Sequence, residues 1–255
     1  MGIVNVTPDS FSDGGQFFEP EKAVEQARRL AEQGADILDI GGESTRPYGG
    51  KKPVDEAEEL ARLKPVLPAV AKIGVPISID TIKAKVAAWA LEQGAVILND
   101  VWGFQRDADM ARVAAEHRAT VVLMHNRDKA DAAIDILDDI REFFARSLEI
   151  AARAGVARER IVLDPGIGFG KTPEQSIHAI ARLDELREFG LPLLMGLSRK
   201  RFIESVSPAS PDQRLGGSIA GNVMAALAGA DIVRVHDVAE TVQALRVMDA
   251  IRKAK

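Results

Sequence analysis

Three polar residues of this chain each stand at or beside the end of a short apolar run, and their types suit recognition of a flat ligand. They are Asp80, Asn99 and Asp164, and the runs are rich in Ile, Leu and Val. Carboxylates and amides that face one plane can satisfy the donors and acceptors of a ring with adjacent N–H and C=O groups. If the fold brings the three runs together, these side chains predict a binding site for a heterocycle.

A second group of residues is cationic and suits an anion. Lys200 follows another apolar run, and Arg234 and His236 lie two residues apart, so a strand that continued this far would point both to one face. Donors of this kind, converging beside Asn5 of the first apolar run, suit a phosphate or a diphosphate. The alternative for Arg234 is a salt bridge to a carboxylate.

The elements that must position these residues alternate along the whole chain. The predicted strands are residues 2–6, 35–40, 76–80, 95–99, 120–124, 161–164, 193–197 and 231–235. The predicted helices are residues 20–33, 54–73, 82–93, 108–118, 134–154, 173–189, 213–229 and 238–253. Eight strand-then-helix units predict an α/β fold, a (β/α)8 barrel in a single domain over residues 1–255, with an open doubly wound sheet as the alternative. Such a barrel gathers the C-terminal ends of its strands in one mouth, where both groups of residues would meet.

A weak internal repeat supports equivalent units. Residues 32–40 recur at 92–100, and residues 228–235 echo both, each with a helix end, a glycine and then a buried strand. The glycines, suited to left-handed helix caps, are Gly34, Gly94 and Gly229. The repeat aligns Asp39, Asn99 and Arg234 at one position near the end of a strand.

Every predicted strand carries a polar residue at its end, and at the fifth strand this residue is His125. Three of these polar residues, Asp39, Asp100 and Thr81, we interpret as structural hydrogen-bonding or capping groups rather than site residues. The convergence of the remaining strand ends still favours a functional mouth.

Two loops without hydrophobic periodicity are candidates for closing over a ligand, with surface connectors as the alternative. The first, residues 7–15, holds an isolated aromatic residue, Phe11, among polar neighbours. The second, residues 41–50, has hydroxyls and a guanidinium between paired glycines. A third stretch, residues 166–172, ends like a phosphate-binding P-loop, but Pro165 stands where that pattern requires its first glycine, so we reject the motif.

Composition bounds the partners and the location. The formal net charge is -5, which argues against nucleic acid and anionic membranes as main partners. The absence of cysteine excludes disulfides and thiolate metal sites and favours a cytoplasmic location. No pair of histidines has metal-ligand spacing, which leaves a hard cation such as Mg²⁺, bound mainly through ligand phosphates.

Taken together, these segments resemble the dihydropteroate synthases of the pterin-binding family. The matching segments are residues 5–15, 42–47, 78–81, 99–101, 164–169, 198–200 and 234–237. They run in order through nearly the whole chain. The resemblance implies a transferase of folate synthesis that condenses p-aminobenzoate with 6-hydroxymethyl-7,8-dihydropterin diphosphate, giving 7,8-dihydropteroate and pyrophosphate by a Mg²⁺-assisted, largely dissociative displacement. It also implies small-molecule substrates and a homodimer.

The resemblance assigns roles to individual positions. Asp80, Lys200, Arg234 and His236 would be catalytic. Residues that contact the pterin, its diphosphate or the aminobenzoate would be Asn5, Thr45, Arg46, Asp80, Asn99, Val101, Met124, Asp164, Phe169, Lys200, Arg234 and His236. Asn5 would also be the metal ligand. Loop closure would involve Asp9, Phe11, Ser44 and Pro47.

Two departures from the family pattern limit this transfer. After His125 the chain reads Asn126-Arg127-Asp128, where a Met-Gln-Gly run is common, and Arg201 replaces a frequent serine. We therefore carry over no contact from either place. The competing functions are a methyltetrahydrofolate-dependent methyltransferase of the same barrel, which has no use for a diphosphate site, and a pterin-binding protein without catalysis.

Overall fold

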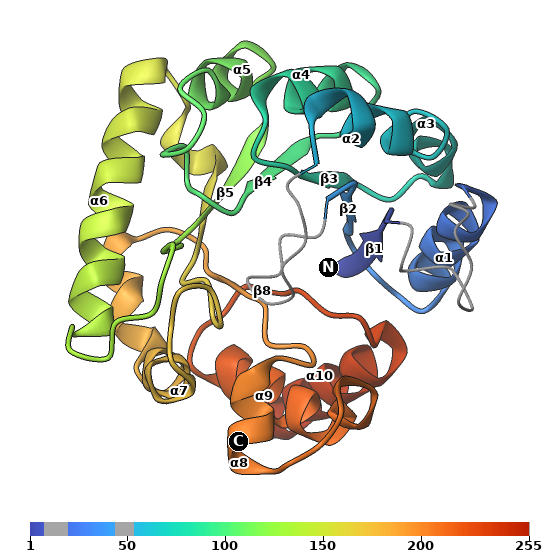
Figure 1. The fold of residues 1–255 in the computed structure, drawn as a ribbon. Helices are drawn as coiled ribbons and strands as arrows, with labels where there is room; N and C mark the ends of the chain where they lie inside the picture. Colours follow the sequence, from blue (N-terminus) through green and yellow to red (C-terminus); the bar gives the residue numbers. More distant parts are fainter. Residues whose placement is uncertain (8–19, 44–53, 255) are drawn as a thin grey trace.

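The computed structural model describes residues 1–7, 20–43 and 54–254. Its strands are β1 (Gly2–Asn5), β2 (Leu38–Gly41), β3 (Ile77–Asp80), β4 (Ile97–Asp100), β5 (Thr120–Met124), β6 (Ile161–Asp164), β7 (Leu194–Met195) and β8 (Ile232–Val233). Strands β1 to β6 form one parallel sheet in sequence order, and β7 pairs with β8 in parallel. Single parallel bridges, Gly2 to Val235 and Leu163 to Leu193, join the two sheets at both edges. The eight strands thus close into the predicted (β/α)8 barrel (Figure 1).

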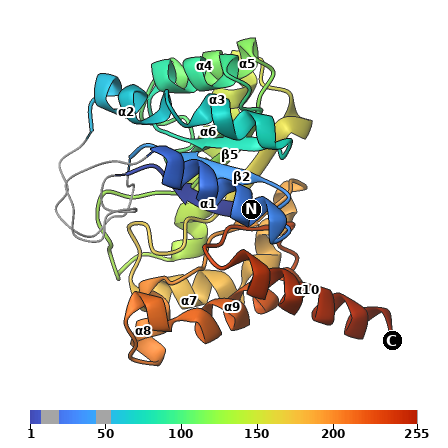
Figure 2. The same ribbon diagram turned by 90° about the vertical axis from the view of Figure 1, so that its right-hand side faces the viewer.

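The helices form a ring outside the strands (Figures 1 and 2). They are α1 (Pro20–Glu32), α2 (Glu56–Leu63), α3 (Leu67–Val70), α4 (Ala84–Glu92), α5 (Met110–Glu116), α6 (Ile136–Ala154), α7 (Pro173–Ala181), α8 (Arg201–Val206), α9 (Leu215–Leu227) and α10 (Val238–Lys253). Short 3-10 turns are η2 (Ala71–Ile73), η3 (Arg158–Arg160), η4 (Leu183–Phe189) and η5 (Pro211–Gln213). None of the helices in the described ranges is long and apolar enough to cross a membrane.

The predicted helix boundaries needed correction in three places. The helix predicted over 54–73 is broken between α2 and α3, because Pro65 lacks an N–H group and its ring clashes with the preceding turn. The helix predicted over 173–189 changes after Ala181 into the 3-10 turn η4. Helix α8 was not predicted, since its six residues are too few to show a helical period. By contrast, Gly34, Gly94 and Gly229 all have left-handed φ values of 96°, 107° and 104°, as the repeat predicted.

Side chains of the strands alternate between two environments. Outward-facing residues such as Leu38, Ile79, Leu98 and Leu123 are fully buried in the main core, where each contributes roughly 1.5–3 kcal/mol through burial. A smaller apolar cluster fills the barrel; its members are Met1, Ile97, Val122, Val162 and Leu194, with Ile37 and Ile232 packed against it. Successive side chains of a strand point to opposite faces, so the next inward positions come two residues later. They are Ile3, Asp39, Asn99, Met124, Asp164, Gly196 and Arg234. The period of the strands therefore puts a layer that includes the polar residues Asp39, Asn99, Asp164 and Arg234 directly above an apolar one.

Candidate active site

The centre of the barrel mouth is a guanidinium held between two carboxylates. Arg234 Nε donates to Asp39 Oδ2 at 2.5 Å, and Arg234 Nη2 donates to Asp80 Oδ2 at 2.9 Å. Asp39 is fully buried and Asp80 nearly so. The structure thus realises the salt-bridge alternative for Arg234, with two carboxylates instead of one.

The three residues aligned by the internal repeat meet in this layer. Asn99 Nδ2 donates to Asp39 Oδ2 at 3.2 Å, beside the contact from Arg234. Asp39 is a hydrogen-bonding group, as we interpreted it, but we did not predict that the two residues that it orients are site residues. The repeat alignment was the signal that could have revealed it.

Several oxygens of this layer have no hydrogen-bond partner within the described residues. They are Asp39 Oδ1, Asp80 Oδ1, Asn99 Oδ1 and Ser78 Oγ, all buried. Leaving a buried acceptor without a donor costs about 1–3 kcal/mol. A ligand that presented N–H groups here would remove that cost. The layer therefore has the chemistry of a site for a donor-rich ring.

Electrostatics in the mouth depend on one cation shared by two acids. Burial raises the pKa of Asp80 to about 8, and Arg234 opposes this shift while Asp39 adds to it. Burial also acts to lower the pKa of Arg234, but Asp39 and Asp80 outweigh it and raise that pKa. Without a ligand, Asp80 therefore holds its proton at neutral pH, and Arg234 stays charged.

A second cation lies beside Asp164 and Phe169. Lys200 Nζ donates to the carbonyl oxygen of Ile167 and lies 4.8 Å from the centroid of the Phe169 ring. Asp164 Oδ1 accepts the N–H of Gly166 at 2.8 Å. Burial lowers the pKa of Lys200 to about 8, with Asp164 opposing the shift. Burial raises the pKa of Asp164, and Lys200 opposes that shift in turn.

The remaining residues predicted to bind the pterin provide apolar side chains for the wall of the site. Met124 ends β5 in register with Asp164, and it is buried. Val101 follows β4, is buried, and its carbonyl oxygen accepts from Asn126 Nδ2 at 3.0 Å. Together with the Phe169 ring, these side chains could flank a flat ligand.

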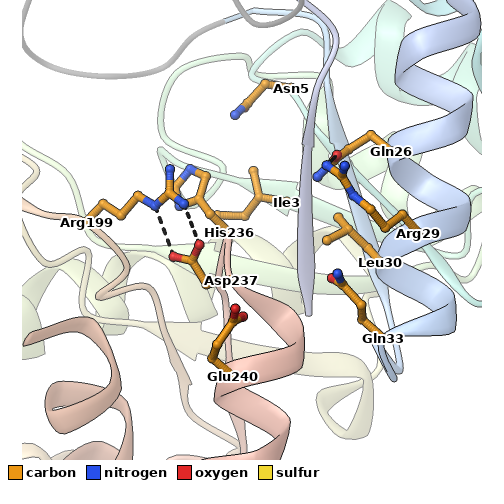
Figure 3. Close-up of a pocket in the computed structure, with 10 residues that line it drawn as sticks. All are labelled: Ile3, Asn5, Gln26, Arg29, Leu30, Gln33, Arg199, His236, Asp237 and Glu240. Atoms are coloured by element: carbon orange, nitrogen blue, oxygen red, sulfur yellow. Dashed lines mark hydrogen bonds and ion pairs between the residues drawn. The ribbon is translucent and has the colours of Figure 1, made fainter. Parts of the chain in front are cut away.

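Asn5 and His236 border a cavity of about 550 Å³ between α1 and α10. Figure 3 shows both side chains on the same cavity, with Arg199 and Asp237 beside them. Ser198 Oγ lies 3.0 Å from His236 Nδ1 and accepts the His236 backbone N–H at 3.2 Å. The carboxylate–amide layer and Arg234 are not part of this lining, so the cavity holds two of the three residues predicted for the diphosphate and is separate from the polar layer.

His125 does not belong to the mouth, contrary to its place among the strand-end residues. Its ring is fully buried and contacts Asp139 of α6 and the Phe143 ring, because one residue after inward-facing Met124 the side chain points outward. Asp100 is structural, as predicted: its carboxylate accepts the backbone N–H groups of Trp102 and Phe104.

Six predicted loop residues lie outside the described residues. They are Asp9, Phe11, Ser44, Thr45, Arg46 and Pro47. Of the residues rejected with the P-loop motif, Lys171 is buried behind the site. Its neighbour Thr172 caps helix α7 in a capping box with Gln175, which is the structural use of that segment.

Comparisons with known proteins identify the family. A family model described as "Pterin binding enzyme" matches residues 1–236. The chain is 46% identical to the dihydropteroate synthase of Clostridium beijerinckii over 98% of this chain and 93% of that one. A solved dihydropteroate synthase from Clostridium difficile, studied with pteroic acid, superposes with a TM-score of 0.93 at 50% identity, over 98% of this chain and 95% of that one. The enzyme from Xanthomonas albilineans in complex with 7,8-dihydropteroate gives 0.90 at 43% identity, over 98% and 92%. The chain belongs to the pterin-binding enzymes and, within them, to the dihydropteroate synthases.

Proposed function

We propose that this chain condenses p-aminobenzoate with 6-hydroxymethyl-7,8-dihydropterin diphosphate through the residues of the barrel mouth. The observation that carries the proposal is a layer of buried oxygens on Asp39, Asp80 and Asn99 that have no hydrogen-bond partner among the described residues and lie next to the Arg234 guanidinium. One end of the substrate, a pterin ring, is rich in N–H donors, and the other end is a diphosphate. The two chemistries of the mouth match the two ends.

The pterin would bind in the carboxylate–amide layer. Its ring N–H groups would donate to Asp80, Asn99 and Asp164, and its carbonyl oxygen would accept from Lys200. Contacts of this kind favour the charged forms of Asp80 and Lys200 over the neutral forms that their pKa values near 8 otherwise permit.

The diphosphate would lie toward Asn5, Arg234 and His236. The described residues hold no group of three or more His, Cys, Asp or Glu side chains placed for a metal ion. A cation here would take its ligands from the Asn5 amide oxygen, water and the diphosphate, and this set suits Mg²⁺. Bound Mg²⁺ would neutralise charge on the diphosphate oxygens.

The reaction breaks one bond and forms another at the pterin methylene. The C–O bond to the diphosphate breaks, its electron pair leaves with pyrophosphate, and positive charge remains on the pterin. The amine nitrogen of p-aminobenzoate then forms a C–N bond to the methylene and releases one proton to solvent. Ionised Asp80 stabilises the cationic pterin, while Arg234 and His236 stabilise the leaving group. Because the charges are separated in the transition state, preorganised groups of both signs lower the barrier.

The test is pyrophosphate release when both substrates and Mg²⁺ are mixed with the protein. We expect release that depends on both substrates, and a fall of about 100-fold for Asp80→Asn, the size typical of losing one preorganised electrostatic group. Unchanged turnover in Asp80→Asn would refute the electrostatic role. Pterin binding without release under any metal condition would support the non-catalytic protein instead.

The metal contact has its own test in Asn5→Ala. We expect the Mg²⁺ concentration for half-maximal rate to rise about tenfold or more, since removal of groups that support a metal site typically lowers metal affinity about 10–100-fold. Binding of the pterin alcohol, which lacks the diphosphate, is the control and should not change. An unaltered Mg²⁺ dependence would remove Asn5 from the metal site.

We also propose a homodimer through the outer faces of α9 and α10. Met224 and Leu227 of α9 are 61% and 49% exposed, and Val247 and Ile251 of α10 are 55% and 61% exposed. The end of α10 extends beyond the other helices (Figure 2). Such neighbouring apolar side chains are typical of an interface. Met224→Lys should shift the sedimentation coefficient toward the monomer; a wild-type monomer at high concentration would contradict the proposal.

A cytoplasmic location remains a proposal from the lack of cysteine.

A further inference from the structure

Lys171 is a buried amine that has no role in the proposed chemistry. It is only 2% exposed and lies in the segment that follows β6, behind the Phe169 ring. Its Nζ atom lies 2.9 Å from the Gly166 carbonyl oxygen, 3.2 Å from the Phe169 carbonyl oxygen and 2.6 Å from His125 Nδ1. Three contacts match the three N–H groups of an ammonium.

His125 continues the chain of contacts toward a carboxylate. Its Nε2 atom lies 2.8 Å from Asp139 Oδ2, and Arg127 pairs with the other oxygen of Asp139 at 2.8 Å. If Lys171 is an ammonium, His125 accepts at Nδ1 and donates its Nε2–H to Asp139. If the proton has moved to Nδ1, the imidazolium donates to both neighbours. Burial lowers the pKa of Lys171 well below its ordinary value, and burial together with the Lys171 charge lowers the pKa of His125 to about 4. The Lys171–His125 pair therefore carries at most one positive charge, and it faces the Asp139 carboxylate through His125.

The backbone that Lys171 holds is the loop that presents Asp164 and Phe169 to the mouth. The Gly166 N–H donates to Asp164 Oδ1, and the Gly166 carbonyl accepts from both Lys171 and the Phe169 N–H. On its other side the same loop binds Lys200 through the Ile167 carbonyl. Because the proposed function draws Lys200 onto the pterin, Lys171 is the contact that stays with the loop when the substrate binds.

This loop packs closely against residues 125–127, which directly follow β5. At Gly166 a Cβ atom would lie 1.9 Å from the His125 carbonyl oxygen, and at Gly170 one would lie 2.4 Å from Arg127 Cβ. Small displacements of the loop therefore transmit to residues 125–127 and are resisted by them. The amine therefore joins two segments whose backbones already lie in close contact.

We propose that Lys171, oriented by His125 and Asp139, is a positioning residue that fixes the Asp164–Phe169 loop for pterin binding. This inference rests on the proposed function for the identity of the ligand. It predicts a loss confined to the pterin: the affinity for p-aminobenzoate and the folded structure should change little.

The experiment compares Lys171→Met with Arg127→Met as the matched control, since Arg127 contacts Asp139 from outside the Lys171–His125 pair. Equilibrium binding of the pterin diphosphate and KM for p-aminobenzoate are measured for each. We expect Lys171→Met to weaken pterin binding about tenfold and to leave KM for p-aminobenzoate within twofold. Arg127→Met should change neither value by more than about twofold. Equal losses for both substrates, or no loss, would overturn the proposal.

Chemical rescue separates an amine requirement from mere packing. The natural chain has no cysteine, so Lys171→Cys can be alkylated selectively in denaturant and then refolded. Alkylation with 2-bromoethylamine restores an amine at the length of lysine, and iodoacetamide adds a neutral amide of similar bulk. Pterin affinity should return to within about threefold of wild type with the first reagent and not with the second. Equal rescue by both reagents would refute the role of the amine.

Two outcomes need a second variant or readout. If Lys171→Met and Lys171→Cys do not fold, Asp139→Asn tests the same contact from a half-buried position, and an unchanged pterin affinity would then count against the proposal. Wild-type protein that binds the pterin but releases no pyrophosphate would refute the proposed catalysis alone. The Lys171 comparison would still be decided by binding.

Discussion

Pterin binding should exchange protons with solvent, and the direction of exchange should reverse near pH 8. In the ligand-free mouth, burial raises the pKa of Asp80 to about 8, so below this pH the acid is protonated. Burial lowers the pKa of Lys200 to about 8, so above this pH the amine is neutral. A pterin that donates to Asp80 and accepts from Lys200 favours both charged forms. Binding must then remove a proton from Asp80 at low pH and add one to Lys200 at high pH.

The size of the exchange follows from the two pKa values. At pH 7 about 0.9 of Asp80 is protonated and about 0.1 of Lys200 is neutral, so binding releases about 0.8 proton. At pH 8 release and uptake cancel. At pH 9 binding takes up about 0.8 proton. The affinity should therefore fall on both sides of pH 8, because Asp80 is increasingly protonated below this pH and Lys200 is increasingly neutral above it.

Isothermal titration calorimetry measures this exchange directly when repeated in buffers with different ionisation enthalpies. The titration of the free ligand is recorded separately and subtracted. Asp80→Asn should abolish the release at pH 7, and Lys200→Met should abolish the uptake at pH 9. No exchange at pH 7 in the wild-type protein, or the same exchange in Asp80→Asn, would refute the assignment of a protonated Asp80 in the free mouth.

Two further predictions concern the scaffold of the site. Gly166→Ala should destabilise the fold by about 3 kcal/mol or more in urea denaturation, because its Cβ would lie 1.9 Å from the His125 carbonyl oxygen at φ +65°. Gly155 has φ +83°, and no atom of the described residues would lie within 4 Å of its Cβ, so Gly155→Ala should cost only about 1–2 kcal/mol. Equal losses in the two variants would show that backbone strain alone determines the cost. Asp39→Asn should cost about 1.5–3 kcal/mol by weakening the contact from Arg234. It should also move the pH of zero proton exchange below 8, because removal of the Asp39 charge lowers the pKa of the acid that shares the guanidinium; a crossing that stayed at pH 8 would contradict the shared-cation account.

Much of the fold follows from local patterns that need no tertiary contact to be recognised. The internal repeat aligned Asp39, Asn99 and Arg234 at one position near a strand end, and the structure brings these three residues together. Glycines before the strands required left-handed φ values, which the structure has. Helix ends were harder to predict. Over residues 54–73 the apolar periodicity indicates one continuous helix, whereas Pro65 interrupts it between α2 and α3.

The residue types at the strand ends were likewise available from the sequence, because the eight-unit order places all of these ends in one mouth. His125 was the exception. The predicted strand ended at residue 124, as β5 does, but His125 comes one position after inward-facing Met124, so its ring points outward to α6. The mismatch at Pro165 correctly excluded a P-loop, but the sequence then indicated no role for Lys171.

By itself, then, the sequence determined the barrel, its polar layer and the two kinds of charge that the mouth holds, because alternation and element order are local properties. Only the tertiary structure decided the partners: Arg234 is shared by Asp39 and Asp80, which lie 195 and 154 positions away, and Lys171 is joined to His125 across 46 positions. Contacts between distant residues depend on barrel closure and on which side chain reaches which atom. These contacts, together with burial, set the pKa values near 8 on which the proposed binding chemistry depends.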